Sequence, residues 1–421
     1  MKRNSHTLRL AAIAAASALV LTACGSDDSG DDKGDGDKPA AKGDGVLTVG
    51  TLLPQTGNLA FLGPPEFAGV DLAVKDINEA GGVLGKDVVQ VKGDSGDTDS
   101  GIAPAEADKL IKAKADVIVG AAASGVSMTV IDKIMSAGVV QFSPANTSPS
   151  FDEGAYSKPD LYFRTAPSDI LQGAVMANLL VKEGRQNVAI LARQDAYGET
   201  LAKEVKKNLE AAGSTVAVSE LYSEKDGPSD TQIAAVADAD PDAIVLIAFE
   251  ETTTIIPKLI QAGVAPKDVP TYFVDGNTAD YSGKLPDGTL EGTKGTTPAV
   301  DLSDEFKKRL ATVDDSLKDY TYAAESYDAV VVSALAAIAA DDDSGTAIAK
   351  EIPGVTKDGE KCTSFADCKA LLEDGKDIDY DGVSGEIELS DLGSPTSASI
   401  GIFQYGPDNT YKAVDYIKGS I

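Results

Sequence analysis

The chain has 421 residues, 43% of them apolar, and its 67 Asp and Glu against 37 Lys and Arg give a formal charge of −30. This length allows two or three domains with cores of their own. The acidity argues against nucleic acid as a partner, because the chain would repel phosphate. The only histidine is His6, so a chain that loses its N-terminus has no imidazole for Ser-His-Asp catalysis, Cys-His catalysis or metal binding.

Residues 1–23 are typical of an export signal. Basic residues precede an apolar run over 10–21, which is shorter than the ~20 residues of a spanning helix. The run ends in LTACG, which resembles the lipobox of bacterial lipoproteins, where the cysteine, here Cys24, becomes the lipidated first residue. The alternative is an ordinary export signal with a chance cysteine. The motif predicts an extracytoplasmic protein at the outer face of the bacterial cytoplasmic membrane, anchored there through lipid on Cys24.

Residues 24–45 have almost no apolar side chains, so we expect an acidic, flexible tether. No later segment is expected to span a membrane, because the most apolar one, 323–340, is interrupted by Glu325, Ser326 and Asp328. An exported compartment permits disulfides, and Cys362 and Cys368 remain once Cys24 is set aside. A disulfide between them is favoured over two free thiols.

From residue 46 onward the hydrophobic pattern alternates between strands and helices. Strands are predicted over 46–53, 88–91, 116–120, 139–142, 187–191, 215–221, 243–248 and 270–274, with further strands at 385–389, 399–405 and 411–416. Helices are predicted over 64–80, 104–113, 126–137, 169–183, 198–212, 231–237, 252–262, 304–313 and 322–340. The alternation predicts parallel sheets covered on both faces, and its two runs predict two doubly wound α/β lobes.

Polar residues follow several of these strands, where open α/β sheets bind their ligands. Ser124 comes just after 116–120, at the start of a helix whose free amides favour a carboxylate. Asp275 follows 270–274 and suits an ammonium group. Together they match the two ends of a zwitterion. Each has a plainer interpretation as well, because Ser is common at helix N-caps and Asp before Gly is common in turns.

A set of motifs carries a resemblance over nearly the whole chain after residue 45. They are LPQTGNLAFLGPPEFAGVDLAVKDINEAGGVLGK, VGAAASGVS, FSPANTSPSF, FRTAPSD, DAYGE, FVDG and GIFQY, in this order. In this set the chain resembles the ABC-transporter substrate-binding lipoproteins of the Leu/Ile/Val-binding family, which have the type I periplasmic-binding fold. The resemblance implies a receptor that captures a small solute, an aliphatic amino acid above all, and delivers it to an ABC permease.

The resemblance also implies site residues. Ser124, Ala145 and Thr147 match the positions that hold the ligand's α-carboxylate and α-amino group. Tyr197 matches the family's Tyr-Gly motif, and Asp275 matches the acid that holds the ammonium, although branched-chain binders commonly have Glu there.

Two positions that line the side-chain pocket depart from the family. Leu62, with Phe61 beside it, stands where an aromatic residue is frequent, and Phe249 stands where a Tyr is frequent. These departures leave the ligand's side chain open, and amides, short peptides and aromatic acids remain alternatives to aliphatic amino acids.

The resemblance implies discontinuous lobes joined by a three-strand hinge whose closure buries the ligand. Lobe 1 is expected over 46–165 and 297–396, and lobe 2 over 166–296 and 397–421. We expect a monomer without a cofactor. A sensor of the same fold that signals to a membrane regulator is the alternative function.

Two other functions find little support. Asp377–Glu388 matches the EF-hand pattern of acids and glycine, but a strand rather than a helix is predicted after it, so an acidic turn is favoured over a calcium site and no metal is expected. Neither G-x-S-x-G nor S-x-x-K occurs. A hydrolase that uses carboxylates alone is a remote alternative, and the chain is predicted not to be an enzyme.

Overall fold

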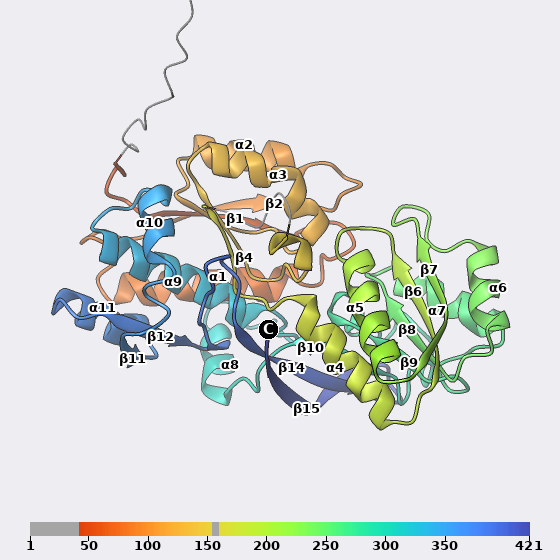
Figure 1. Ribbon diagram of the computed structural model, residues 1–421. Coiled ribbons are helices and arrows are strands. Elements are labelled where there is room, and N and C mark those ends of the chain that lie inside the picture. The colour runs from red at the N-terminus through yellow and green to blue at the C-terminus, as the bar shows by residue number, and fades with distance from the viewer. Residues whose placement is uncertain (1–41, 154–159) are drawn as a thin grey trace, which may run out of the picture. The chain divides into compact units, whose positions relative to one another are not determined.

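Two sheets of mainly parallel strands organise the fold (Figure 1). The structure is a computed structural model that describes residues 42–153 and 160–421. The expected signal peptide, Cys24 and nearly all of the expected tether lie outside the described residues.

The first sheet has five strands in the order β2-β1-β3-β4-β5, and all neighbouring strands are parallel. The strands are Thr48–Leu53 (β1), Val89–Asp94 (β2), Val117–Gly120 (β3), Val140–Ser143 (β4) and Tyr162–Arg164 (β5). The residues of β1, β3 and β4 are buried throughout, as expected for strands of a parallel sheet covered on both faces.

The second sheet has seven strands in the order β15-β14-β10-β9-β8-β6-β7. They are Asn187–Arg193 (β6), Thr215–Tyr222 (β7), Ala243–Ile247 (β8), Thr271–Phe273 (β9), Lys294–Pro298 (β10), Ser397–Tyr405 (β14) and Tyr411–Ser420 (β15). Pairing is parallel from β7 to β10 and antiparallel between β10, β14 and β15.

Helices connect the parallel strands, as crossovers must. They are Gly63–Glu79 (α1), Ala103–Lys112 (α2), Ser124–Ser136 (α3), Asp169–Lys182 (α4), Gly198–Ala211 (α5), Asp230–Asp238 (α6), Thr252–Gln261 (α7), Asp304–Leu310 (α8), Ala323–Ala340 (α9), Gly345–Glu351 (α10) and Phe365–Glu373 (α11). Serine side chains accept a backbone N–H at the start of several helices, including Ser168 before α4 and Ser303 before α8. The predicted α/β class with parallel sheets is confirmed.

The chain passes three times between the two sheets. It leaves the first sheet after β5 and enters the second at β6. After β10 it returns to α9, which packs against β3 and β4 of the first sheet. It then leaves again between β13 (Gly385–Glu386) and β14.

Helix α9 is a core helix. It is long and apolar enough to cross a membrane, contrary to the expectation from its polar residues, but 83% of it is buried inside the protein. It packs closely on α1, where a Cβ added at Gly69 would lie 2.2 Å from the carbonyl oxygen of Ala323. A glycine is therefore needed at this crossing.

Several elements differ from the prediction. The sequence pattern missed β5, β10, α10, α11, and the strands Glu360–Cys362 (β11) and Ile378–Gly382 (β12). The predicted strand over 385–389 is only Gly385–Glu386, and α8 ends at Leu310 instead of 313. The missed strands are short or contain Gly, Pro and acids, and pairing with their neighbours, rather than local propensity, holds them in place.

Strands β11, β12 and β13 form a small separate sheet that carries the disulfide. The predicted bond between Cys362 and Cys368 is confirmed and joins β11 to α11. The residues with the EF-hand pattern form β12 and β13, and Lys361 Nζ lies 2.9 Å from carboxylate oxygens of both Asp379 and Asp381. Among the described residues, no group of three or more His, Cys, Asp or Glu is arranged to hold a metal.

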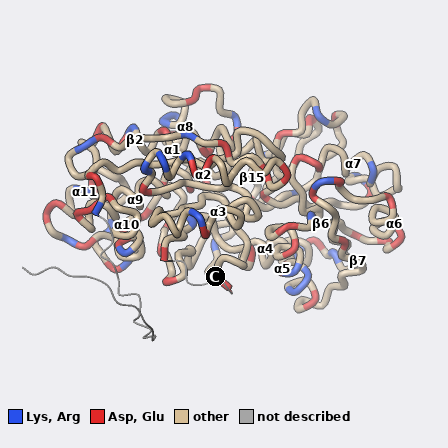
Figure 2. Tube along the Cα trace, turned by 90° about the horizontal axis from the view of Figure 1, so that it is seen from above, with Lys and Arg blue, Asp and Glu red and all other residues tan. Residues whose placement is uncertain are grey.

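Acidic residues are spread over the elements of both sheets (Figure 2). Their excess is therefore a property of the whole described surface and does not mark one tract.

Candidate functional site

A small cavity lies beyond the carboxyl ends of strands from both sheets. Its walls come from the segments after β1, β3, β4, β6, β8 and β9, and from Tyr322 just before α9. The volume open to the centre of a water molecule is about 10 Å³, which is enough for about one water. The lining residues are Leu59, Leu62, Ala122, Ala123, Ser124, Ala145, Tyr197, Phe249, Asp275, Gly276 and Tyr322.

Asp275 is the charged residue of this cavity. The hydroxyl of Tyr197 donates to its Oδ1 at 2.6 Å, and the hydroxyl of Tyr322 donates to its Oδ2 at 2.8 Å. Gln172 Nε2 also donates to Oδ1, at 2.8 Å. Burial raises the pKa of Asp275, and these three hydrogen bonds counteract the increase because they favour the charged form.

Asp169, at the start of α4, is a second buried acid close to Asp275. Thr147 Oγ1 donates to its Oδ2 at 3.1 Å, while its Oδ1 has no hydrogen-bond partner. Burial and the neighbouring Asp275 hold the pKa of Asp169 well above its ordinary value. Since Asp275 accepts three hydrogen bonds from side chains and Asp169 one, the charged form is favoured more at Asp275 than at Asp169, and we assign the shared proton of the pair to Asp169 on this ground.

Ser124 presents hydrogen-bond donors to the cavity from the first turn of α3. Its Oγ accepts only a long bond of 3.4 Å, from the backbone N–H of Ser148, which leaves its own hydroxyl proton available. The helix N-terminus adds unpaired backbone N–H groups and a partial positive charge. This corner of the cavity suits an anionic group such as a carboxylate.

A buried arginine stabilises the loop that contains Ala145. Arg164 is fully buried, and its Nη1 donates to the carbonyl oxygens of Asn146 and Ser148 at 3.1 and 3.0 Å. It also pairs with Asp152. Asn146 Nδ2 donates in turn to the carbonyl of Ala122 at 2.8 Å, so the loops after β3 and β4 are fixed to each other.

One wall of the cavity is aromatic. The ring of Phe249 stacks on Tyr197, with ring centres 5.5 Å apart. The guanidinium group of Arg193 also lies over the Phe249 ring, 3.5 Å from the ring centre. A Cβ added at Gly276 would come within 2.7 Å of the Phe249 ring, so only glycine allows the ring this position.

Most of the residues predicted to form the site lie together. Six of them line the cavity: Leu62, Ser124, Ala145, Tyr197, Phe249 and Asp275. Thr147 and Phe61 do not line it, and Thr147 instead contacts Asp169 behind it. The sequence analysis missed Tyr322, Asp169, Gln172 and Arg164. The motif FRTAPSD contains Arg164 and Asp169 and could have indicated them. No comparable local motif indicated Tyr322.

Hydrogen bonds also join the two sides of the cavity. Ser148 Oγ donates to the carbonyl oxygen of Ala196 at 2.8 Å, and the N–H of Glu250 donates to the carbonyl oxygen of Asn58 at 3.3 Å. Segments that follow the first sheet are thereby tied to segments that follow the second. A solute larger than a water molecule can occupy the cavity only if these walls move apart.

The fold is similar to that of solved solute-binding proteins. A leucine-binding protein LivK from Thermotoga maritima superimposes with a TM-score of 0.72 at 22% identity, over 88% of this chain and 99% of that one. The substrate-binding protein LivJ from Streptococcus pneumoniae, solved in complex with isoleucine, gives 0.71 at 20% identity, over 89% and 100%.

The family model described as periplasmic binding protein matches residues 46–378, so the chain belongs to the periplasmic binding protein family. The chemotactic substrate-binding protein BasB of Halobacterium salinarum is 26% identical over 371 residues, covering 82% of this chain and 83% of that protein. A Leu/Ile/Val-binding protein homolog of Brucella melitensis is 26% identical over 368 residues, covering 85% and 91%. These findings confirm the resemblance that the motifs indicated.

Proposed function

We propose that this protein is a lipid-anchored extracytoplasmic receptor that binds an amino acid in the cavity around Asp275 and delivers it to an ABC importer. Asp275 carries the proposal, because it is a buried carboxylate opposite the unpaired donors of Ser124 and the α3 N-terminus. A zwitterion satisfies both: its ammonium pairs with Asp275 and its carboxylate receives the hydrogen bonds of α3.

The apolar wall supports an aliphatic side chain for the ligand. Leu59, Leu62 and Phe249 surround the remaining space. In this proposal the two lobes, 46–165 with 297–396 and 166–296 with 397–421, separate to admit the ligand and close over it. Closure gives the permease a shape that depends on the ligand.

The first test measures melting temperatures of the detergent-solubilised full chain with each proteinogenic amino acid, small amides and benzoate. A ligand at ~100 times its Kd stabilises the protein by ~2.7 kcal/mol, which raises Tm by about 3 °C in a chain of this size. Asp275→Asn and Ser124→Ala should abolish the increase, while Asp268→Asn, an exposed acid, should keep it. The proposal fails if no amino acid raises Tm, or if Asp275→Asn responds like the wild type.

Anchoring is tested separately in cells. Cys24→Ala should release the protein from the membrane fraction and remove labelling by radioactive palmitate. A variant that stays with the membrane would contradict lipid attachment at Cys24.

A sensor is the second candidate, because BasB, which aligns over most of the chain, belongs to a chemotactic signal transduction system. Uptake of the radiolabelled ligand by cells with and without the gene separates the two functions. A strain that lacks the gene and takes up the ligand normally would favour the sensor. Turnover of amides or sugars by the purified protein would instead favour the remote alternative, a carboxylate-only hydrolase.

A further inference from the structure

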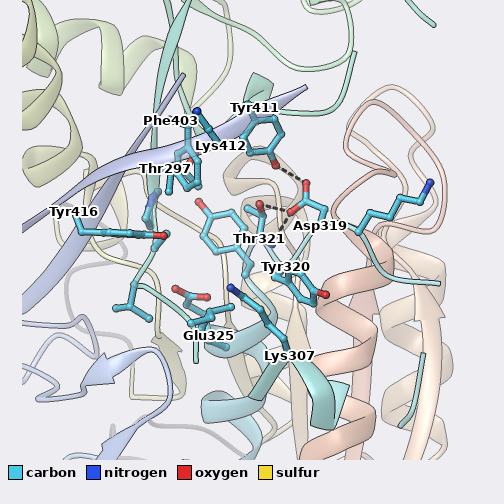
Figure 3. A pocket seen from close by; sticks show the side chains of 18 of the residues that line it. Thr297, Lys307, Asp319, Tyr320, Thr321, Glu325, Phe403, Tyr411, Lys412 and Tyr416 are labelled. Carbon is cyan, nitrogen blue, oxygen red and sulfur yellow. Dashed lines mark hydrogen bonds between the residues drawn. The ribbon is translucent and has the colours of Figure 1, made fainter. Parts of the chain in front are cut away.

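A second and much larger cavity, drawn in Figure 3, shares Tyr322 with the first in its lining. Its volume is about 450 Å³, within the range of about 300–1,000 Å³ that is typical of small-molecule sites. Its walls come from the segment after β10, helix α8, the residues before α9, and strands β14 and β15. Tyr322 lines both cavities.

Glu325, in the first turn of α9, projects its carboxyl group into this cavity (Figure 3). The residue is only 6% exposed, and no side chain of the described residues donates a hydrogen bond to it. Asp319, by contrast, accepts bonds from Thr321 Oγ1 at 2.6 Å and from Tyr411 Oη at 2.7 Å. Of these two acids, Glu325 is therefore the one that accepts no side-chain hydrogen bond within the described residues; its own backbone N–H donates to it.

Two further buried polar groups near Glu325 lack partners. Thr297 lines the cavity, and its hydroxyl, on a residue 2% exposed, makes no hydrogen bond within the described chain. Both carboxyl oxygens of Glu66 on α1, which interacts electrostatically with Glu325, are also unpaired. Unpaired buried polar groups are uncommon in folded proteins. Of these groups, Thr297 and Glu325 line the cavity, where a ligand with hydrogen-bond donors would reach them.

Basic side chains also line the cavity wall. Lys307, Lys318 and Lys412 line it, and none of them forms an ion pair with a described carboxylate. In a chain with nearly twice as many acids as bases, three unpaired lysines around one cavity are notable. Aromatic residues make up much of the remaining wall: Tyr320, Phe403, Tyr411, Tyr416 and Tyr322.

We propose that this cavity is a second small-molecule site, which binds an amino acid with an apolar or aromatic side chain. The ammonium group of the ligand pairs with Glu325, its carboxylate pairs with Lys307, and its side chain packs on the tyrosines. This site is separate from the one around Asp275 and does not depend on the function proposed above.

The test uses fluorine NMR of para-fluoro-L-phenylalanine with the full chain. Asp275→Asn removes the first site and should leave this binding intact. Glu325→Gln and Lys307→Met should each weaken it about tenfold or more, which corresponds to ~1.4 kcal/mol. Ala413→Trp fills the cavity from strand β15 and should abolish binding, while the neighbouring Val414→Trp is the matched control, because Val414 is 47% exposed and does not line the cavity.

Two analogues test the class of ligand. The amine-free para-fluorophenylpropanoate and the carboxylate-free para-fluorophenethylamine should each bind at least about tenfold more weakly than the amino acid. Equal binding of either analogue overturns the assignment of a zwitterion. Binding that survives Ala413→Trp but not Asp275→Asn places the probe in the first cavity and overturns the second site. If about 10 mM para-fluoro-L-phenylalanine does not bind to the wild type, the second site is overturned as well.

Discussion

The hydroxyl of Tyr322 donates a hydrogen bond of 2.8 Å to Oδ2 of Asp275, across 47 residues of sequence. Through this bond a residue just before α9 orients the acid that follows β9. The residue has a left-handed backbone, with φ of 60°. It thus supports the proposed ammonium site, and it lines the larger cavity as well.

Removing this bond should weaken ligand binding. Tyr322→Phe keeps the ring and removes the donor, and a hydrogen bond to a charged group is worth about 1.5–3 kcal/mol. We expect the Kd of the amino acid found in the melting screen to rise at least about tenfold by calorimetry. Tyr320→Phe is the control, because Tyr320 lines only the larger cavity, and its Kd should not change.

The two buried acids should respond differently to the same substitution. Asn resembles a protonated carboxyl group, so Asp169→Asn should change the Kd by less than about threefold, under ~0.7 kcal/mol. Asp275→Asn removes the charge that pairs with the ammonium and should cost about 2–5 kcal/mol of binding. Similar losses in both variants would show that the negative charge is shared, contrary to the assignment of the proton to Asp169.

Arg193 should contribute strongly to stability. It is 2% exposed and pairs with Asp195, Glu224 and Glu251 at 2.6, 2.9 and 2.8 Å, in addition to its contact with Phe249. Arg193→Met leaves these acids without their cation and should lower the free energy of unfolding by about 3–5 kcal/mol in urea titrations.

The control for Arg193 is an exposed ion pair. Lys284 lies 2.8 Å from Glu250, with both side chains about 40% exposed. Lys284→Met should cost no more than about 1 kcal/mol. Equal effects of the two substitutions would mean that burial does not determine the strength of these pairs.

The disulfide should stabilise the protein without affecting its proposed site. Cys362 and Cys368 are six residues apart and line neither cavity. Closing so short a loop reduces the entropy of the unfolded chain by an amount worth about 2 kcal/mol. The double substitution to serine should lower the free energy of unfolding by about that amount and leave the Kd unchanged. A changed Kd would link this distant loop to the cavity.

The pH dependence of stability should report on Glu325. Burial raises the pKa of Glu325 to about 8, from an ordinary value of 4.5. Between these values the folded chain keeps a proton that the unfolded chain releases, so stability falls as pH rises, by at most about 1.4 kcal/mol per pH unit. Glu325→Gln removes this loss. In urea titrations, the free energy of unfolding of the variant relative to the wild type should therefore increase from pH 5 to pH 8. If this difference in free energy stays constant, Glu325 is already ionised in the folded protein at pH 5.

The class of fold and most residues of the proposed site could be predicted from the amino-acid sequence. Its alternating periods placed the main strands and helices, because burial on a sheet or a helix face constrains the residues locally. Residues such as Ser124 and Asp275 were found because they directly follow strands, where parallel sheets gather polar groups. The disulfide was predictable because only two cysteines follow Cys24.

Tertiary structure decided the rest. Gln172 contacts Asp275 across 103 residues, and Arg193 lies over Phe249, yet neither relationship leaves a local pattern in the sequence. The second cavity depends on how β15, α8 and the residues before α9 pack together. Local sequence encodes which residues prefer a strand, a helix or the interior, whereas a contact between distant segments depends on the packing of the whole chain, and so only the folded structure reveals it.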